Sequence, residues 1–159
     1  MNNEHYRMAE IHRERGKRFY ESGEIANAVA ELTESYKFDP RDADTLYLLA
    51  ELYGAAGFID PAVDLIQKSL RENYMNVPGW LMLANLYAQK GGPAYLDLAL
   101  NQLDMAKNLD PNNAMQFYLR GNILAQQGKR DEAAEALKKA LEIDPENAYS
   151  KHDLEAISK

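Results

Sequence analysis

Apolar residues recur every three or four positions along most of the chain, with polar residues between them. In residues 43–57, Leu46, Leu49 and Tyr53 have the i, i+3, i+7 spacing that places side chains on one face of an α-helix. Gly57 closes this stretch, and glycine most easily takes the left-handed conformation with which many helices end. No alternating run of apolar and polar residues predicts a β-strand. The pattern therefore predicts an all-α fold of amphipathic helices.

The helical pattern repeats with a nearly constant period. The similar phrases YKFDP, KNLDP and LEIDP end at Pro40, Pro111 and Pro145, and an alanine stands 12 residues before each proline. The starts of the aligned units are separated by 34, 34, 37 and 34 residues. Each unit holds two helices joined by a tight turn, and stability depends on stacking because a single pair cannot bury its apolar face. We expect a single domain over 1–159 that contains repeats 9–42, 43–76, 77–113 and 114–147 and a capping helix at 148–158.

Composition and charge narrow the classes of partner. Acidic residues outnumber basic ones by 25 to 18, and the net charge of −7 argues against a nucleic-acid binder, which relies on Lys and Arg. The absence of cysteine excludes disulfides and thiolate sites. No apolar run reaches the roughly 20 residues that span a bilayer, and the N-terminal residues are too polar for a secretory signal. We therefore expect no membrane insertion, no nucleic-acid partner and a cytoplasmic location.

The sequence offers no candidate catalytic, metal or cofactor site. His5 and His12 lie seven residues apart, but no third ligand follows at metal-binding spacing, so we interpret them as a solvent-exposed pair. The acidic residues are spread along predicted solvent faces and do not form an acid–base couple. Gly91-Gly92 is not followed by the Lys and Ser or Thr of a phosphate-binding loop. We therefore expect no catalytic activity, no metal and no cofactor.

The repeated phrase resembles the tetratricopeptide repeat from residue 9 to about residue 158. In that family, small residues allow the two helices of a unit to approach closely, and bulky apolar residues fill the surrounding space. The resemblance implies a right-handed superhelical solenoid of four helix-turn-helix repeats with a C-terminal capping helix. Polar residues stand at apolar positions of the pattern in two units: His12 and Arg15 in the first, and Arg120 in the fourth. The residues that match in the fourth unit are Phe117, Gly121, Leu124, Ala133, Leu137, Ala140 and Pro145.

The resemblance also implies peptide or protein recognition on a concave face that the first helices of the repeats line. At the corresponding positions the chain has a polar, partly basic N-terminal end and an apolar centre of Tyr, Leu and Met. Met is pliable and Tyr combines an apolar ring with a polar tip, so both suit a protein partner. The expected function is a non-enzymatic scaffold or interaction module that binds an apolar or amphipathic peptide segment of a partner protein. The candidate binding residues are Arg13, Lys17, Tyr47, Leu48, Glu51, Leu81, Met82, Asn85, Met115, Tyr118, Leu119 and Asn122.

One specialised form of this function is not expected. Family members that hold the acidic C-terminal tails of heat-shock chaperones use a Lys, Asn, Asn, Lys and Arg clamp. The corresponding residues of this chain are Arg13, Lys17, Leu48, Pro78 and Met82, so no carboxylate clamp is predicted.

Alternatives for the apolar candidates stay open at this point. Tyr47 and Tyr118 also fit the role of generic packing residues. Leu48, Met82 and Leu119 also fit the space between adjacent helices. A function in binding therefore competes with a function in packing at each of these five positions.

Two further functions are compatible with the same scaffold. The third repeat has three extra residues near 91–96, which we predict to form a longer turn between its helices. With this turn, the repeat resembles the domains of bacterial c-type cytochrome maturation proteins that bind a C-terminal helix of an apocytochrome. The other alternative is a self-assembling structural scaffold, in which copies of the chain form a homo-oligomer through the groove or the exposed ends of the stack.

Overall fold

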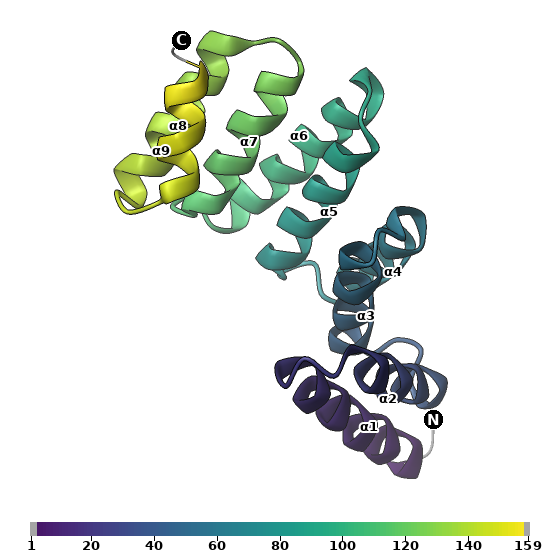
Figure 1. The fold of residues 1–159 in the computed structure, drawn as a ribbon. Coiled ribbons are helices and arrows are strands. Elements are labelled where there is room, and N and C mark those ends of the chain that lie inside the picture. The colour runs from purple at the N-terminus through teal and green to yellow at the C-terminus, as the bar shows by residue number, and fades with distance from the viewer. Residues whose placement is uncertain (1–2, 158–159) are drawn as a thin grey trace. The chain divides into compact units, whose positions relative to one another are not determined.

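The computed structural model describes residues 3–157, which form nine α-helices and no β-strand (Figure 1). The expected all-α fold is therefore confirmed. Helices begin at the first residues of the last three predicted repeats and of the capping helix, whereas the first helix begins six residues before its repeat. Residue 158, the expected end of the capping helix, lies outside the described residues. The helices are α1 (Asn3–Glu21), α2 (Ile25–Phe38), α3 (Ala43–Ala55), α4 (Ile59–Glu72), α5 (Val77–Lys90), α6 (Pro93–Leu109), α7 (Ala114–Gln126), α8 (Arg130–Ile143) and α9 (Ala148–Ile157).

The helices belong to two compact units, Met1–Tyr74 and Met75–Lys159. The first unit contains the hairpins α1–α2 and α3–α4, and α2 packs on α3. The second contains the hairpins α5–α6 and α7–α8 and the helix α9, which packs on α8 and α7. The boundary falls in residues 73–76, where the second repeat lacks the closing Asp-Pro of the other three repeats. The organisation as one domain stays a prediction.

The core of each hairpin follows the predicted repeat positions. The second helix of every hairpin buries an alanine and, four residues later, a large apolar side chain. These fully buried pairs are Ala28 with Leu32, Ala62 with Ile66, Ala99 with Leu103, and Ala133 with Leu137. On the first helices, a Cβ at Gly16 would lie 2.6 Å from Cγ of Leu32, and a Cβ at Gly121 would lie 2.7 Å from Cγ of Leu137. The paired helices therefore approach closely where the sequence places its smallest residues.

The third hairpin turns differently from the others. Three hairpins use a three-residue connection in which one glycine has a φ between +77° and +84°. In the third, Gly91 and Gly92 both have positive φ, and α6 starts at Pro93. The predicted longer turn is wrong, because α6 has 17 residues whereas α2, α4 and α8 have 14 each. Two glycines reverse the chain in two residues and proline suits a first helical turn, so the extra residues lengthen the helix.

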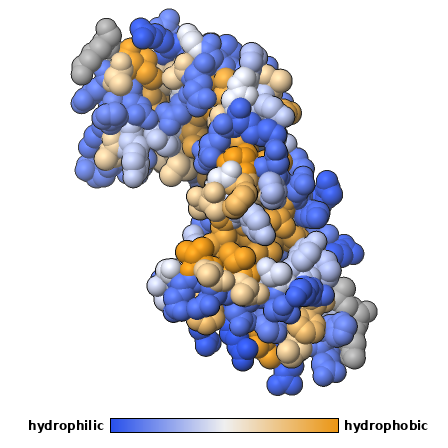
Figure 2. All heavy atoms as spheres, turned by 45° about the vertical axis from the view of Figure 1, so that its right-hand side comes forward, coloured by the Kyte–Doolittle hydropathy of each residue, from blue (hydrophilic) through white to orange (hydrophobic). Residues whose placement is uncertain are grey.

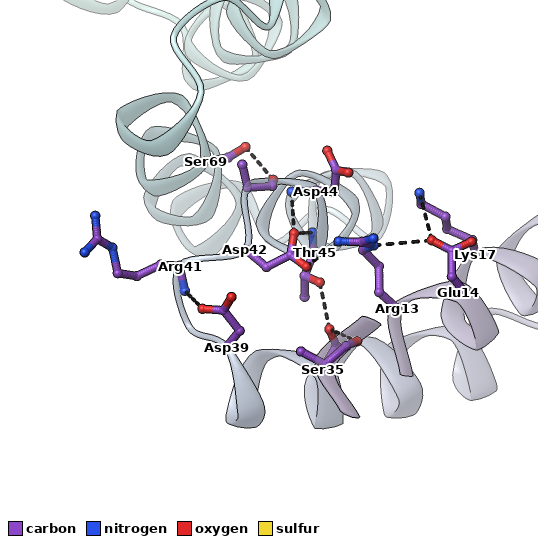
Figure 3. Close-up of polar contacts among 12 residues, drawn as sticks. Arg13, Glu14, Lys17, Ser35, Asp39, Arg41, Asp42, Asp44, Thr45 and Ser69 are labelled. Carbon is purple, nitrogen blue, oxygen red and sulfur yellow. Dashed lines mark hydrogen bonds and ion pairs between the residues drawn. The ribbon is translucent and has the colours of Figure 1, made fainter. Parts of the chain in front are cut away.

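Buried hydroxyl groups connect neighbouring helices of the first unit. Oγ of Ser35 on α2 donates to the carbonyl oxygen of Ala9 on α1 at 2.8 Å. The same Oγ lies 2.8 Å from Oγ1 of Thr45 on α3, so Ser35 links three helices. Ser69 on α4 donates in the same way to the carbonyl oxygen of Ala43, at 2.7 Å (Figure 3). These contacts add polar specificity to the apolar packing of α1, α2 and α3.

Candidate functional site

The predicted binding residues all lie on α1, α3, α5 and α7, the first helices of the four hairpins. Within each of the two compact units, we call the surface formed by these residues the first-helix face of that unit. The residues divide between the two compact units. The first unit holds Arg13, Lys17, Tyr47, Leu48 and Glu51, and the second holds Leu81, Met82, Asn85, Met115, Tyr118, Leu119 and Asn122.

The two predicted basic site residues of the first unit, Arg13 and Lys17, are paired with acidic residues (Figure 3). A guanidinium nitrogen of Arg13 lies 2.6 Å from Oδ2 of Asp42, and its Nε lies 3.4 Å from Glu14. Lys17 Nζ also lies 3.4 Å from Glu14. Burial opposes the charge on Arg13, but the ion pair and hydrogen bond with Asp42 outweigh it and raise the pKa of Arg13. The two predicted basic site residues therefore already have acidic partners within the unit.

Asp42 also caps the N-terminus of α3, and this capping contact holds its carboxylate beside Arg13. Its Oδ1 accepts hydrogen bonds from the backbone N–H groups of Asp44 at 3.0 Å and Thr45 at 3.3 Å, at the start of α3. A carboxylate at a helix N-terminus satisfies free N–H groups and favours the helix dipole. Asp42 thereby joins α1 to the first turn of α3.

We expect substitutions at this pair to separate its two roles. Arg13→Gln and Asp42→Asn should each lower the free energy of unfolding by roughly 0.5–1 kcal/mol, because each removes the ion pair while Asn still caps. Asp42→Ala should cost about 1 kcal/mol more, since it also removes the cap. Denaturant unfolding of the three variants measures the series. Unchanged stability of Arg13→Gln would show that the ion pair between Arg13 and Asp42 does not contribute to the stability of the fold.

Two tyrosines and a carboxylate lie together on the first-helix face of the first unit. The hydroxyl of Tyr20 on α1 lies near the carboxylate of Glu51 on α3. Burial raises the pKa of both Tyr20 and Tyr47, and the nearby carboxylate of Glu51 raises the pKa of each further. Both hydroxyls therefore stay protonated at neutral pH and can donate. Leu48 is partly buried and packs against the buried cluster of Ala28, Leu32, Leu49 and Leu52, so packing is one of its roles.

The most exposed apolar part of the first-helix face lies in the second unit. Met115 on α7 keeps 44% of its surface exposed. The ring centroid of Tyr118 lies 6.0 Å from that of Tyr149 on α9, and Tyr149 is 70% exposed. Tyr149 is not among the residues predicted from the sequence, although it stands 34 residues after Met115 and continues the repeat register into the capping helix.

The remaining predicted residues of the second unit differ in exposure. Leu81 and Met82 on α5 and Leu119 on α7 are partly buried. Asn85 is exposed and Asn122 is partly buried, so at least one of these amides meets solvent. Helix α7 packs on both α5 and α9. The first-helix face of this unit therefore extends across these three neighbouring helices.

His12 corrects one expectation from the sequence. Its Nδ1 lies 2.7 Å from Oε2 of Glu31 on α2, and its side chain is only 16% exposed. Its ring stacks on Phe38 with a centroid distance of 5.6 Å, and the ring of His5 meets the same Phe38 edge-on at 5.9 Å. The solvent-exposed interpretation is therefore wrong for His12, because a histidine that stacks on an aromatic ring fills an apolar position of the repeat. Residues 3–157 contain no cluster of three or more metal-ligating side chains.

None of the helices described in residues 3–157 combines the length and apolarity that crossing a bilayer requires. Hydrophobic residues are exposed among hydrophilic ones in both units in the view of Figure 2. The cytoplasmic location stays a prediction.

A family model and curated relatives match parts of the chain. Residues 114–147 match the model described as tetratricopeptide repeat. Over 124 residues, the chain is 32% identical to cellulose synthase operon protein C from Pseudomonas fluorescens, a match that covers 78% of this chain and 10% of that protein. The chain spans a tenth or less of the length of the curated relatives that it matches.

Solved structures share the fold over most of the chain. MamA residues 41 to the end from Desulfovibrio magneticus RS-1 superpose with a TM-score of 0.83 at 21% identity, over 95% of this chain and 84% of that chain. The first repeat domain of Spaghetti (RPAP3), solved with the HSP90 peptide SRMEEVD, superposes with a TM-score of 0.68 at 22% identity, over 76% of this chain and 93% of that chain. At these sequence identities, the structural similarity shows a shared helical repeat fold and nothing further about function.

Proposed function

The chain belongs to the tetratricopeptide-repeat family, and from this premise we propose that it is a non-enzymatic interaction module that binds an apolar or amphipathic peptide segment of a partner protein. The observation that carries the proposal is the open apolar surface of Met115, Tyr118 and Tyr149 in the second unit. Domains of this family bind protein or peptide partners on their helical surfaces. The twelve predicted residues are the proposed contacts, and Tyr149 joins them.

The chemistry of this surface favours apolar anchors in the ligand. Met115 adapts its shape to an irregular partner, and the two tyrosine rings offer large apolar contact area at a low cost in side-chain entropy. The amides of Asn85 and Asn122 supply donors and acceptors that suit a peptide backbone. An amphipathic helix or an extended segment with large apolar side chains has the complementary pattern.

The first unit favours a different part of a ligand. The carboxylate of Glu51 lies near Tyr20 and Tyr47, and no cation of the described residues pairs with it. A carboxylate beside aromatic rings favours a Lys or Arg side chain through ion pairing and cation–π contact. We therefore include a basic residue among the ligand features that this module recognises.

The structure of the third hairpin bears on the alternatives. Similarity to c-type cytochrome maturation proteins depended on a lengthened turn at 91–96, and the chain has a lengthened α6 in its place. We do not retain that alternative. The RPAP3 domain is an example of the same fold with a bound chaperone peptide, but Leu48, Pro78 and Met82 occupy clamp positions here. Acidic chaperone tails are therefore not the proposed ligand.

A peptide array that varies apolar and basic positions, followed by fluorescence anisotropy on the best sequences, tests the proposal. We expect affinities on the order of micromolar for a short groove. The double variant Met115→Glu/Tyr149→Glu should weaken binding by roughly 100-fold, because it places two carboxylates on a surface from which the apolar side chains of the bound peptide exclude water. Both residues are exposed, so the variant should keep its helicity in circular dichroism.

The matched control is Leu98→Glu/Met105→Glu, which changes two apolar residues of α6 that are each 39% exposed in the same unit. This control should bind the peptides as the unaltered chain does. Equal binding by the two double variants would place the peptide site away from the first-helix face.

A further inference from the structure

Arg120 is the departure from the repeat pattern that the proposed peptide site does not use. It lies on α7 at the position where the second and third repeats have Leu49 and Leu83. One of its guanidinium nitrogens pairs with Oδ1 of Asp104 on α6 at 2.5 Å, and its side chain is 22% exposed. A guanidinium group has five N–H donors, so this ion pair leaves donors for another acceptor.

A cavity of about 310 Å³ lies beside Arg120. It is lined by the three helices α6, α7 and α8. Its apolar lining consists of Leu100, Phe117, Leu124 and Ala136, and two of these belong to a buried cluster of the second unit. The cavity volume lies at the lower end of the roughly 300–1,000 Å³ that small-molecule sites occupy.

The charged lining of the cavity is predominantly positive, in contrast to the chain as a whole. The four basic residues Lys107, Arg120, Lys129 and Lys139 face two carboxylates, whereas the whole chain has a net charge of −7. None of the ion pairs among residues 3–157 involves Lys107 or Lys129. Lys139 Nζ lies 5.9 Å from the ring centroid of Phe117, which holds this cation over the apolar part of the lining.

The cavity and the first-helix face use different sides of α7. Phe117, Arg120 and Leu124 follow the i, i+3, i+7 spacing of one helical stripe and line the cavity. Met115 and Tyr118 belong to a neighbouring stripe and do not line it. A ligand of the cavity and a peptide on the first-helix face therefore occupy separate surfaces.

We propose that this cavity binds a small amphipathic anion, in which an apolar group about the size of one large side chain carries a carboxylate or a phosphate. The apolar group contacts Phe117 and Leu124, and the anionic group accepts hydrogen bonds from Arg120 and ion pairs with the surrounding lysines. The two anionic groups share this recognition chemistry, so the experiment includes both.

Titration of the ¹⁵N-labelled full chain with four probes tests the proposal by NMR. The probes are N-acetyl-leucine, its neutral amide, phenyl phosphate and inorganic phosphate. We expect N-acetyl-leucine or phenyl phosphate to shift the amide signals of residues 117–124 and 129–139 in a saturable way. At least one of these two probes should bind at least tenfold more tightly than the neutral amide and inorganic phosphate. The tighter of the two anions identifies the carboxylate or the phosphate as the preferred group.

Two variants and a control make the test specific. Arg120→Leu introduces the residue that other repeats have at this position, and it should keep the fold and weaken anion binding at least tenfold. Lys129→Gln, at an exposed position, should weaken it several-fold. Lys138→Gln changes a lysine of α8 that does not line the cavity and should have no effect. Equal binding of N-acetyl-leucine and its amide, full binding by folded Arg120→Leu, or no saturable shift with either anion would overturn the proposal.

Discussion

Truncation of Leu137 to alanine is expected to lower the free energy of unfolding by about 2–5 kcal/mol. The side chain is fully buried on α8, and its Cγ and Cδ2 lie against Gly121 of α7. Removing these atoms leaves a cavity in the closest part of the hairpin, where two backbones limit how far the neighbours can relax. Denaturant unfolding monitored by circular dichroism measures the loss.

The same contact predicts strong coupling between positions 121 and 137. In the unaltered chain, a Cβ at Gly121 would lie 2.7 Å from Cγ and 2.9 Å from Cδ2 of Leu137. Gly121→Ala should therefore cost about 1–3 kcal/mol by overpacking, although alanine has the better helix propensity. In the Leu137→Ala background the two closest atoms are gone and only the carbonyl oxygen of Ala133 stays close, at 3.2 Å, so Gly121→Ala should cost much less there than in the unaltered chain. A double-mutant cycle measures this coupling, and strictly additive effects would contradict the packing described.

Ser35→Ala is expected to lower the free energy of unfolding by about 1–3 kcal/mol, more than an exposed serine change would. Its Oγ donates to the carbonyl oxygen of Ala9 and contacts Oγ1 of Thr45, and all of these atoms lie in a buried seam. The substitution leaves a carbonyl and a hydroxyl buried without this partner. Thermal and denaturant unfolding of the variant provide the measurement.

Two comparisons make the Ser35 result interpretable. Ser22→Ala removes a hydroxyl that also donates to a backbone carbonyl, that of Phe19 at 3.1 Å, but at an exposed position. Its cost should stay within about 0.5 kcal/mol. Thr45→Val in the Ser35→Ala background removes the hydroxyl that Ser35→Ala leaves without its partner and should recover part of the loss. If Ser22→Ala and Ser35→Ala cost the same, the buried seam contributes no special stability.

The architecture was predictable because its determinants are local and repeated. A helix starts at Ala43, Val77, Ala114 and Ala148, as the repeat register predicts, and the small residues lie where helices approach most closely. The third hairpin is the exception. Three residues amount to nearly one helical turn, so they extend α6 without disturbing its apolar stripe, and spacing alone does not distinguish a longer helix from a longer turn.

The side-chain partners on the first-helix face were less predictable. Arg13 pairs with Asp42 across 29 residues, and His12 pairs with Glu31 across 19. Helical periodicity identifies which side chains share a face of one helix, but it does not specify which charge of the next helix each will meet. Tyr149 was within reach, because the 34-residue period that places Met115 also places it. That apolar positions 81 and 118 lie on one groove with Tyr47 stays a prediction.

The geometry of the Gly91-Gly92-Pro93 segment limits how the length of this chain can vary. Both glycines have positive φ, no atoms lie within 4 Å of a Cβ built on either, and the helix restarts at once. Insertion or deletion of one residue between Leu96 and Ala99 would rotate the first turn of α6 by about 100° relative to the rest of the helix and carry Leu96, which is 6% exposed, out of the core. Changes of three or four residues nearly restore the phase. Insertions and deletions here are therefore compatible with the fold only when they add or remove about a whole helical turn.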